Sequence, residues 1–136
     1  MPRILAIDYG LKRCGIAVTD PLQIIAQGLQ TVETPQLMKF LKAYTASEDV
    51  EKVIIGLPLN LDDSPTHATP LVQKFITAFQ KHLPHIFIET VDERMSSKQA
   101  TQSIRQMGLR KKASQQKKLV DQVAATLLLQ AYLEHP

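Results

Sequence analysis

Hydrophobic residues in this chain form short runs at strand spacing in the first part of the sequence and recur at helical spacing between those runs. The runs predict strands at residues 3–8, 14–19, 24–32, 52–58 and 85–93. The turn YGLKR is a plausible hairpin loop between the first two, and Gly10 is free to take a positive φ there. The third run is weaker, because Gly28 interrupts it.

Four helices are expected from the capping signals and the periodicity. The first has Thr34 as N-cap and Pro35 at its first position, and the second begins near Pro70. The third begins at Ser96 or Ser97 and ends near Gly108, and Ser114 caps the last. Because the two later strands are reached through helices, they favour parallel pairing. The predicted fold class is α/β, with one mixed five-stranded sheet (a three-strand antiparallel meander plus two parallel strands) flanked by helices.

Length and composition favour one domain over residues 1–136, since 44% of the residues are hydrophobic and no linker or repeat interrupts the pattern. No apolar run approaches the roughly 20 residues that span a bilayer, and the start Met-Pro-Arg is unlike a signal peptide. Cys14 is the single cysteine, which excludes an internal disulfide. We therefore expect a cytoplasmic protein with no membrane partner.

The net charge is only +3, so the distribution of charge along the chain is more informative than its total. Residues 105–118 contain six basic residues and no acid, namely Arg105, Arg110, Lys111, Lys112, Lys117 and Lys118. Such a cluster suits a polyanion such as nucleic acid, although it is equally typical of a solvated surface.

Carboxylates stand at the ends of two predicted strands and inside the last helix. Asp8 ends the first strand, Asp92 and Glu93 end the fifth, and Asp121 lies beside the apolar stripe of the last helix. Ligand sites of open α/β sheets lie beyond the carboxyl ends of the strands, where these residues can converge. Closely spaced carboxylates need a cation, and Mg²⁺ or Mn²⁺ prefers oxygen ligands.

Each acid also has a structural interpretation. Asp8 could form a turn, Asp92 or Glu93 could pair with Arg94, and Asp121 could be a buried, hydrogen-bonded brace. Asp20 is expected to cap the turn with Pro21 rather than to bind metal. The histidines show no paired ligand spacing, and Cys14 has no evident partner for nucleophilic chemistry.

Four stretches together resemble the YqgF/RuvX family of Holliday-junction-resolvase-like proteins, which are associated with nuclease processing of pre-16S ribosomal RNA. These are DYGLKRCGIAVTD (8–20), VIIGLPLNLD (53–62), DERMSS (92–97) and KKLVDQVAATLLLQAYL (117–133). The resemblance implies an RNase H-like fold and metal-dependent phosphodiester hydrolysis. It implies Asp8, Glu93 and Asp121 as catalytic acids and metal ligands, with Asp92 as a further candidate ligand.

Basic residues near these acids are then expected to hold the substrate backbone. The expected nucleic-acid-binding residues are Lys12, Arg13, Arg94, Arg110, Lys111, Lys112, Lys117 and Lys118. Two features depart from the family pattern: Asp62-Asp63 replaces an Asp-Gly pair, and ASQQ dilutes the basic stretch before Asp121.

Several alternatives stay open at this point. Precursor 16S ribosomal RNA is the expected substrate of a metal-dependent endonuclease, and a four-way DNA junction is the alternative. A non-enzymatic RNA-binding factor of the ribosome or transcription machinery is a second alternative. DYGLKRCG also resembles the phosphate hairpin of actin-like ATPases, although no second Gly-rich phosphate loop is present. The protein could be a monomer or a homodimer.

Overall fold

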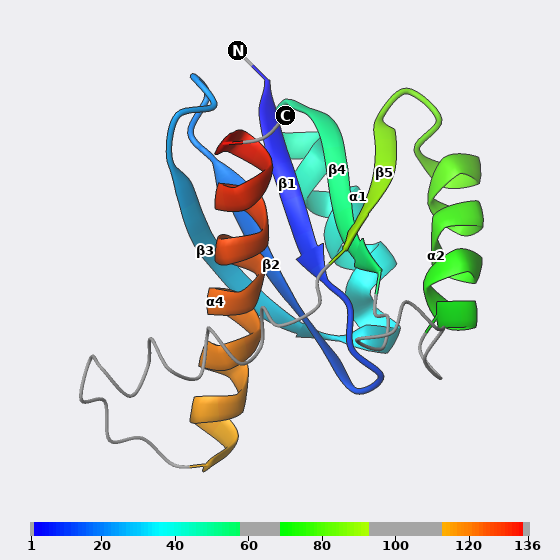
Figure 1. The fold of residues 1–136 in the computed structure, drawn as a ribbon. Coiled ribbons are helices and arrows are strands. Elements are labelled where there is room, and N and C mark those ends of the chain that lie inside the picture. Colours follow the sequence, from blue (N-terminus) through cyan, green and yellow to red (C-terminus); the bar gives the residue numbers. More distant parts are fainter. Residues whose placement is uncertain (1, 58–68, 93–112, 135–136) are drawn as a thin grey trace.

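A computed structural model describes residues 2–57, 69–92 and 113–134, and of residues 57, 69, 92 and 113–121 only the course of the backbone. Its elements are β1 (Arg3–Asp8), β2 (Arg13–Thr19), β3 (Ala26–Glu33), the 3₁₀ turn η1 (Thr34–Gln36), α1 (Leu37–Ser47), β4 (Val50–Leu57), α2 (Thr69–His82), β5 (Phe87–Asp92) and α4 (Ala113–Glu134) (Figure 1). The five strands form one sheet in the order β3-β2-β1-β4-β5.

The strand directions confirm the predicted fold class. β1, β2 and β3 pair in antiparallel fashion as a meander, whereas β1 pairs in parallel with β4, and β4 in parallel with β5. The expected third helix, from residue 96 or 97 to near 108, lies outside the described residues.

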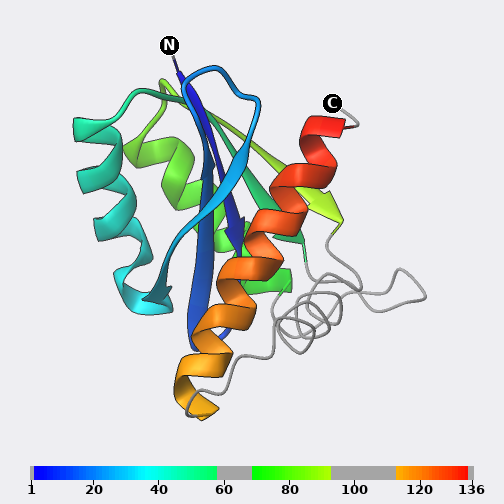
Figure 2. The ribbon, with the colours of Figure 1, turned by 90° about the vertical axis from the view of Figure 1, so that its left-hand side faces the viewer.

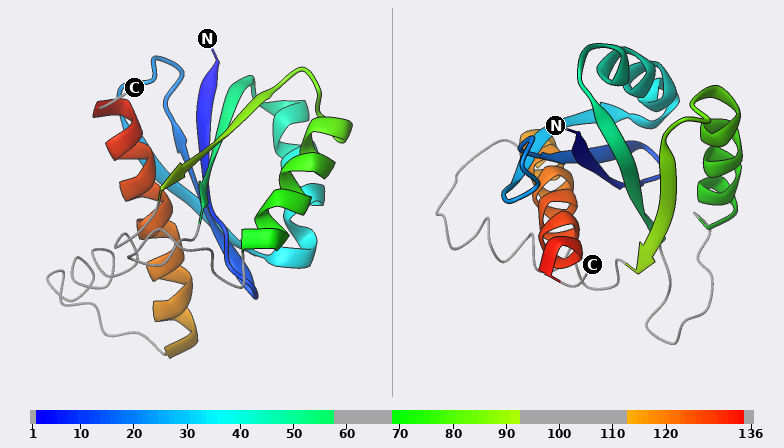
Figure 3. Two further views of the ribbon diagram at one scale, coloured as in Figure 1. Left: turned by 45° about the vertical axis from the view of Figure 1, so that its right-hand side comes forward. Right: turned by 90° about the horizontal axis from the view of Figure 1, so that it is seen from above.

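Helices cover the two faces of the sheet unequally. α1 and α2 lie on one face and α4 on the other, so that the sheet is the middle of three layers (Figure 3). Strand alternation divides the core in the same way: Leu5 and Ile7 of β1 pack with residues of α1 and α2, while Ile4 and Ala6 pack with α4. By the same alternation Asp8, the last residue of β1, lies on the α4 face.

Small residues let α4 approach the sheet closely. Ala6, Ala17 and Gly28 are register partners across β1, β2 and β3. A Cβ atom on Gly28 would lie only 3.3 Å from Thr126 Oγ1 of α4. The glycine that weakens β3 as a strand is therefore explained by the helix that crosses it (Figure 2).

Lys52 of β4 holds the C-terminal end of α4 to the sheet. Its ammonium group donates a hydrogen bond to the Tyr132 hydroxyl and lies 5.0 Å from the centroid of that ring and 5.6 Å from that of Phe87. The hydrogen bond to Tyr132 raises the pKa of Lys52, so the contact favours the charged ammonium. α4 is thus held to the sheet both along its middle and near its C-terminal end.

Two expected helix caps are wrong. Thr34 lies in the 3₁₀ turn before α1, and no side chain caps the N-terminus of either η1 or α1. Ser114 lies within the first turn of α4, because that helix already begins at Ala113. In α4, Ala124, Ala125, Leu128 and Leu129 are buried, and Ala131 is exposed.

Candidate active site

The parallel strands β1, β4 and β5 finish at the same edge of the sheet, with Asp8 and Asp92 as the last residues of β1 and β5. Ile7 pairs with Ile55, and Leu57 pairs with Asp92, so Asp8 and Asp92 are nearly level along the strand direction. β4 lies between them, which separates their backbones by about 10 Å, or two strand spacings. The sequence anticipated the common edge but not the intervening strand.

Asp8 occupies a buried position between two glycines of the adjacent strands. Its residue exposure is only 8%. On one side its register partner is Gly15 of β2. On the other side, the residue after Ile55 in β4 is Gly56. The register positions beside Asp8 on both adjacent strands are therefore glycines, which have no side chains.

The chemistry of this position favours a cation. A carboxylate removed from water must be compensated by hydrogen bonds or by positive charge. Carboxylate oxygens at the end of a strand are the kind of ligand that a hard divalent ion such as Mg²⁺ or Mn²⁺ prefers. Among the residues whose side chains are described, no three His, Cys, Asp or Glu come together as a metal site.

The loop between β1 and β2 is held in place by the junction of β3 and η1. The Thr34 hydroxyl donates a hydrogen bond to the Gly10 carbonyl at 2.7 Å, and the Thr34 backbone N–H donates to the Lys12 carbonyl at 3.0 Å. The Cys14 sulfur lies 3.5 Å from the Thr34 hydroxyl oxygen. This link between residues 24 positions apart was not anticipated, because Thr34 reads as a helix cap.

Gly10 is needed here for a different reason from the one expected. Its φ lies outside the left-handed region, so the hairpin does not use the freedom of glycine to adopt a positive φ. A Cβ atom on Gly10 would lie 2.3 Å from the backbone oxygen of Arg13, a distance that no side chain tolerates. The hairpin turns so tightly that only glycine fits.

Lys12 and Arg13 lie at the same end of the sheet as Asp8, because β1 ends at Asp8 and β2 begins at Arg13. The β1–β2 loop occupies that end in Figure 1. Lys12 is exposed, and Arg13 is half-buried. Together with Thr31, Val32 and Glu33 they line a cavity of about 260 Å³. The loop thus presents positive charge next to a space between the hairpin and β3, as phosphate binding would need.

Tyr9 follows Asp8 and serves the opposite face of the sheet. Its ring packs against Phe75 of α2, with centroids 5.9 Å apart. Burial, together with the nearby Cys14 thiol, raises the pKa of the Tyr9 hydroxyl. Tyr9 therefore anchors the start of the hairpin to α2.

Of the remaining predicted site residues, some are described only by their backbone. These are Asp92 at the end of β5 and Lys117, Lys118 and Asp121 in the first half of α4. Others lie outside the described residues, namely Glu93, Arg94, Arg110, Lys111 and Lys112. Asp20, by contrast, is the turn cap that the sequence predicts: its carboxylate accepts hydrogen bonds from the backbone N–H groups of Ile24 and Ile25.

A mixed five-stranded sheet of this order, with helices on both faces, defines an RNase H-like fold of the resolvase type. The crystal structure of the Fowlpox virus resolvase in complex with Holliday junction DNA is similar, with a TM-score of 0.54, 12% sequence identity and coverage of 97% of both chains. At that identity the likeness concerns the fold alone.

The family follows from the sequence. The family described as "RuvX: Holliday junction resolvase" matches residues 2–135, and the chain belongs to that family. A relative from Flavobacterium psychrophilum is 50% identical over 133 residues, covering 98% of this chain and 97% of its own. One from Bacteroides thetaiotaomicron is 46% identical over 134 residues, with 98% and 97% coverage. Both bear the name "Putative pre-16S rRNA nuclease".

Family membership confirms the resemblance drawn from the four stretches and makes the chain a hydrolytic enzyme of the nuclease class. Within the described residues, no helix is both long and apolar enough to cross a bilayer.

Proposed function

We propose that this protein is a divalent-metal-dependent endonuclease that hydrolyses phosphodiester bonds of precursor 16S ribosomal RNA, in the cytoplasm where that RNA is made. The observation that carries the proposal is Asp8: a buried carboxylate at the carboxyl edge of the sheet, flanked by glycines, in a chain of the RuvX family. The names of the relatives support the RNA substrate.

The course of α4 supports Asp121 as a second ligand. α4 runs antiparallel to β1, and its N-terminal end lies at the edge where β1 finishes (Figure 1). Ala6 of β1 and Ala125 of α4 belong to one core cluster. From Ala6 to Asp8 the strand advances about 6.6 Å toward that edge. From Ala125 back to residue 121 the helix advances about 6 Å in the same direction.

The acidic set that we propose is Asp8, Glu93 and Asp121, with Asp92 as the alternative to Glu93 on β5. In this proposal Asp8 contributes an oxygen ligand from the centre of the sheet, and Asp121 contributes a second from α4. These carboxylates would hold a divalent ion, whose chemistry when bound would be to activate a water and to stabilise the leaving oxygen. Asp8 at the end of β1 fits such a site, because it supplies carboxylate oxygens and its register partner is a glycine.

The basic residues have a separate task, which is to hold the sugar-phosphate backbone. Lys12 and Arg13 project from a loop fixed by Thr34, so their backbones need no reordering when a phosphate binds. Lys117 and Lys118, one turn before Asp121, are proposed to contact the strand beyond the cleaved bond, together with Arg94, Arg110, Lys111 and Lys112. Such contacts position a substrate without reading its sequence.

A four-way DNA junction is the second candidate substrate. The description of the family and the junction complex of the Fowlpox virus resolvase favour it. A junction has two cleavable strands related by symmetry, so this function would favour a homodimer, whereas RNA processing is open to a monomer.

A cleavage assay with purified protein tests the proposal. Precursor 16S RNA and a synthetic DNA junction are each incubated with Mg²⁺, Mn²⁺ or a chelator, using wild type, Asp8→Asn and Asp121→Asn. We expect metal-dependent cleavage of the RNA that both substitutions abolish while the fold persists. Binding of RNA without cleavage by wild type under all conditions would instead support a non-enzymatic RNA-binding factor.

A further inference from the structure

The loop between β2 and β3 (residues 20–25) exposes three large aliphatic side chains at the end of the sheet opposite Asp8 (Figures 1 and 2). Leu22 is 59% exposed, Ile24 68% and Ile25 57%. Single exposed aliphatic residues are common, but three within four consecutive positions are typical of an interaction site. The fold does not use these side chains, since none belongs to either core cluster.

The loop is ordered by hydrogen bonds rather than by packing of its own side chains. The Asp20 carboxylate accepts hydrogen bonds from the backbone N–H groups of Leu22, Ile24 and Ile25 at 3.2, 2.8 and 2.7 Å. The Asp20 N–H donates to the Ile25 carbonyl at 3.2 Å. Gln23 has a φ of 60° and donates from Nε2 to the Pro2 carbonyl at 3.0 Å. A loop that is already ordered loses little conformational entropy when a partner binds.

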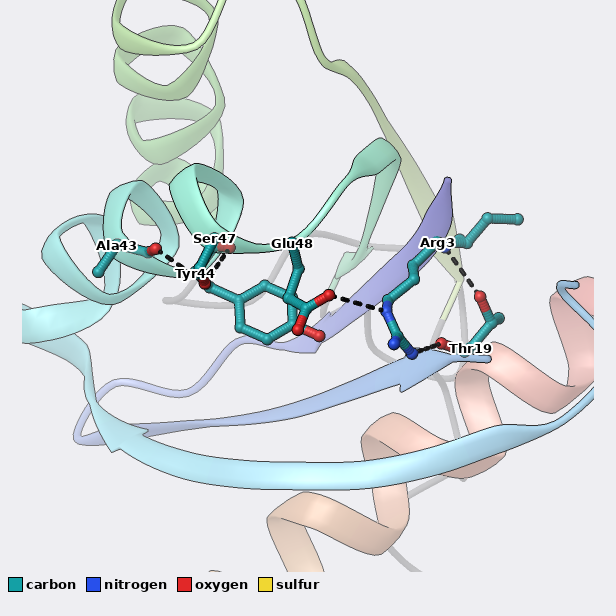
Figure 4. A network of polar contacts seen from close by, with 7 residues as sticks. Arg3, Thr19, Ala43, Tyr44, Ser47 and Glu48 are labelled. Atoms are coloured by element: carbon teal, nitrogen blue, oxygen red, sulfur yellow. Dashed lines mark hydrogen bonds and ion pairs between the residues drawn. The ribbon is translucent and has the colours of Figure 1, made fainter. Parts of the chain in front are cut away.

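Acidic side chains border this apolar loop. Gln23 also donates a hydrogen bond to the Glu51 carboxylate, which ties the loop to the start of β4. Glu48, Asp49 and Glu51 are all exposed there. Two cations near this corner are already engaged. The Arg3 guanidinium lies 3.6 Å from Glu48 and donates to the Thr19 carbonyl at 3.0 Å (Figure 4). Lys52, next to Glu51 in β4, donates a hydrogen bond to the Tyr132 hydroxyl. The corner therefore combines an apolar centre with a negative border.

We infer that this corner, residues 20–25 with Glu48, Asp49 and Glu51, is a docking surface for a protein segment that carries aliphatic side chains bordered by Lys or Arg. Nucleic acid is disfavoured, because phosphates and the acidic border repel each other. A second copy of this chain is disfavoured too, because a twofold contact would bring two acidic borders together. The basic apolar segment is the occupant that complements both features.

The test uses the full-length protein without nucleic acid, so its outcome is independent of the proposed nuclease activity. A synthetic amphipathic peptide of leucine and lysine is titrated into isotope-labelled protein, and amide shifts are mapped by NMR. Matched peptides of leucine and glutamate, and of serine and lysine, serve as controls. We expect saturable shifts confined to residues 20–25 and 48–51, with the leucine–lysine peptide alone.

Variants distinguish peptide binding at this surface from nonspecific binding of the peptide elsewhere on the protein. The triple change Leu22→Ser, Ile24→Ser and Ile25→Ser should weaken the peptide affinity about tenfold or more, since the apolar centre is lost. Leu11→Ser removes a comparably exposed aliphatic residue (58% exposed) at the other end of the sheet and should leave the affinity unchanged. Asp49→Lys should weaken it severalfold at low salt and less at high salt. Circular dichroism checks that each variant is folded.

Three results would overturn the inference. Shifts centred on Lys12 and Arg13, or equal affinity for the glutamate peptide, would mean that this corner does not select a basic apolar segment. No saturable binding of the leucine–lysine peptide would remove the surface altogether. Concentration-dependent dimerisation in sedimentation experiments that the triple serine variant abolishes would make a second copy the occupant.

Discussion

At the end of the sheet where β1 finishes, Thr34 holds a loop that presents Lys12 and Arg13 close to the buried Asp8. At the opposite end, Asp20 holds a loop that presents Leu22, Ile24 and Ile25 next to exposed acids. One polar side chain hydrogen-bonded to backbone groups orders each loop.

The two loops carry different kinds of side chain. The two aspartates near them, Asp8 and Asp20, look alike in the sequence but have different surroundings. Asp8 and Asp20 begin and end the same stretch, DYGLKRCGIAVTD. Asp8 is buried, with glycine as its register partner, whereas the Asp20 carboxylate is occupied by backbone N–H groups. The two carboxylates therefore differ in burial and in their place in the fold, so substitutions at matched positions of the two ends should have unequal effects.

The largest difference is expected between Asp8→Asn and Asp20→Asn. The first removes an anionic oxygen ligand at nearly constant volume and should lower the cleavage rate about 10³-fold or more. The second alters a turn at the far end and should leave the cleavage rate nearly unchanged. Single-turnover cleavage with Mn²⁺ measures both rates, and equal losses would remove the distinction between the two ends.

Gly10→Ala and Gly28→Ala compare two glycines that face different neighbours. The new methyl group at Gly10 meets the Arg13 backbone oxygen at 2.3 Å, which cannot move without reshaping the hairpin. We expect a loss of about 2–3 kcal/mol in the free energy of unfolding. At Gly28 the nearest atom is the Thr126 hydroxyl at 3.3 Å, on a side chain that can shift, and the loss should stay within about 1 kcal/mol. Urea unfolding measures the free energy of unfolding of both variants, and equal losses would contradict the difference expected between the two glycines.

Charge removal at the hairpin should weaken binding of RNA and its dependence on salt. With Lys12→Gln and Arg13→Gln combined, the slope of log affinity against log salt should fall by about 1.5, because each phosphate contact contributes about 0.7–0.9. Lys81→Gln, in the last turn of α2, is the matched control and should leave the slope unchanged. An unaltered slope in the double variant would exclude a backbone-binding role for the hairpin.

Thr34→Val tests whether hairpin position matters for substrate binding. The change keeps the volume but removes the donor to the Gly10 carbonyl, which should cost about 1 kcal/mol of stability and weaken RNA affinity severalfold. Thr34→Ser keeps the hydroxyl and should restore the affinity. If valine and serine variants bind RNA equally well, the hydrogen bond has a structural role only.

The smallest expected effect is the response of the Asp20 loop to low pH. Backbone hydrogen bonds, above all from Ile25, lower the pKa of Asp20 below its ordinary value. Its contribution to the loop is therefore present above pH of about 3.9 and is lost as pH falls through the lower folded-state pKa. NMR titration of the Asp20 carboxyl carbon, with the Ile24 and Ile25 amides as reporters, should show coincident changes below pH of about 3.9. A midpoint at or above the ordinary aspartate value would contradict the cap.

The predicted strand bounds are right where burial sets the hydrophobic pattern. They are wrong where a side chain takes the backbone N–H groups that strand pairing would otherwise use. β1 was predicted at residues 3–8 and spans Arg3–Asp8, because its residues are buried in turn against the two helical layers. β3 was expected from residue 24 but begins at Ala26. Ile24 and Ile25 have strand-forming side chains, yet the Asp20 carboxylate takes their N–H groups.

The candidate site was predictable only where the local sequence pattern specifies it. Asp8 at a strand end follows from an apolar run that stops at a carboxylate. The hydrogen bond from Thr34 to Gly10 depends on how β3 returns beside the hairpin, which no local pattern specifies. The expected convergence of Asp8, Glu93 and Asp121 rests on family resemblance and on the course of α4, and stays a prediction.

The most direct measurement for that convergence is anomalous diffraction from crystals of the protein soaked with Mn²⁺. The account predicts anomalous density within about 2.0–2.3 Å of oxygen atoms from both Asp8 and Asp121, with a third carboxylate from the end of β5. Fully occupied density elsewhere, or Asp8 and Asp121 carboxylates too far apart to share an ion, would contradict it.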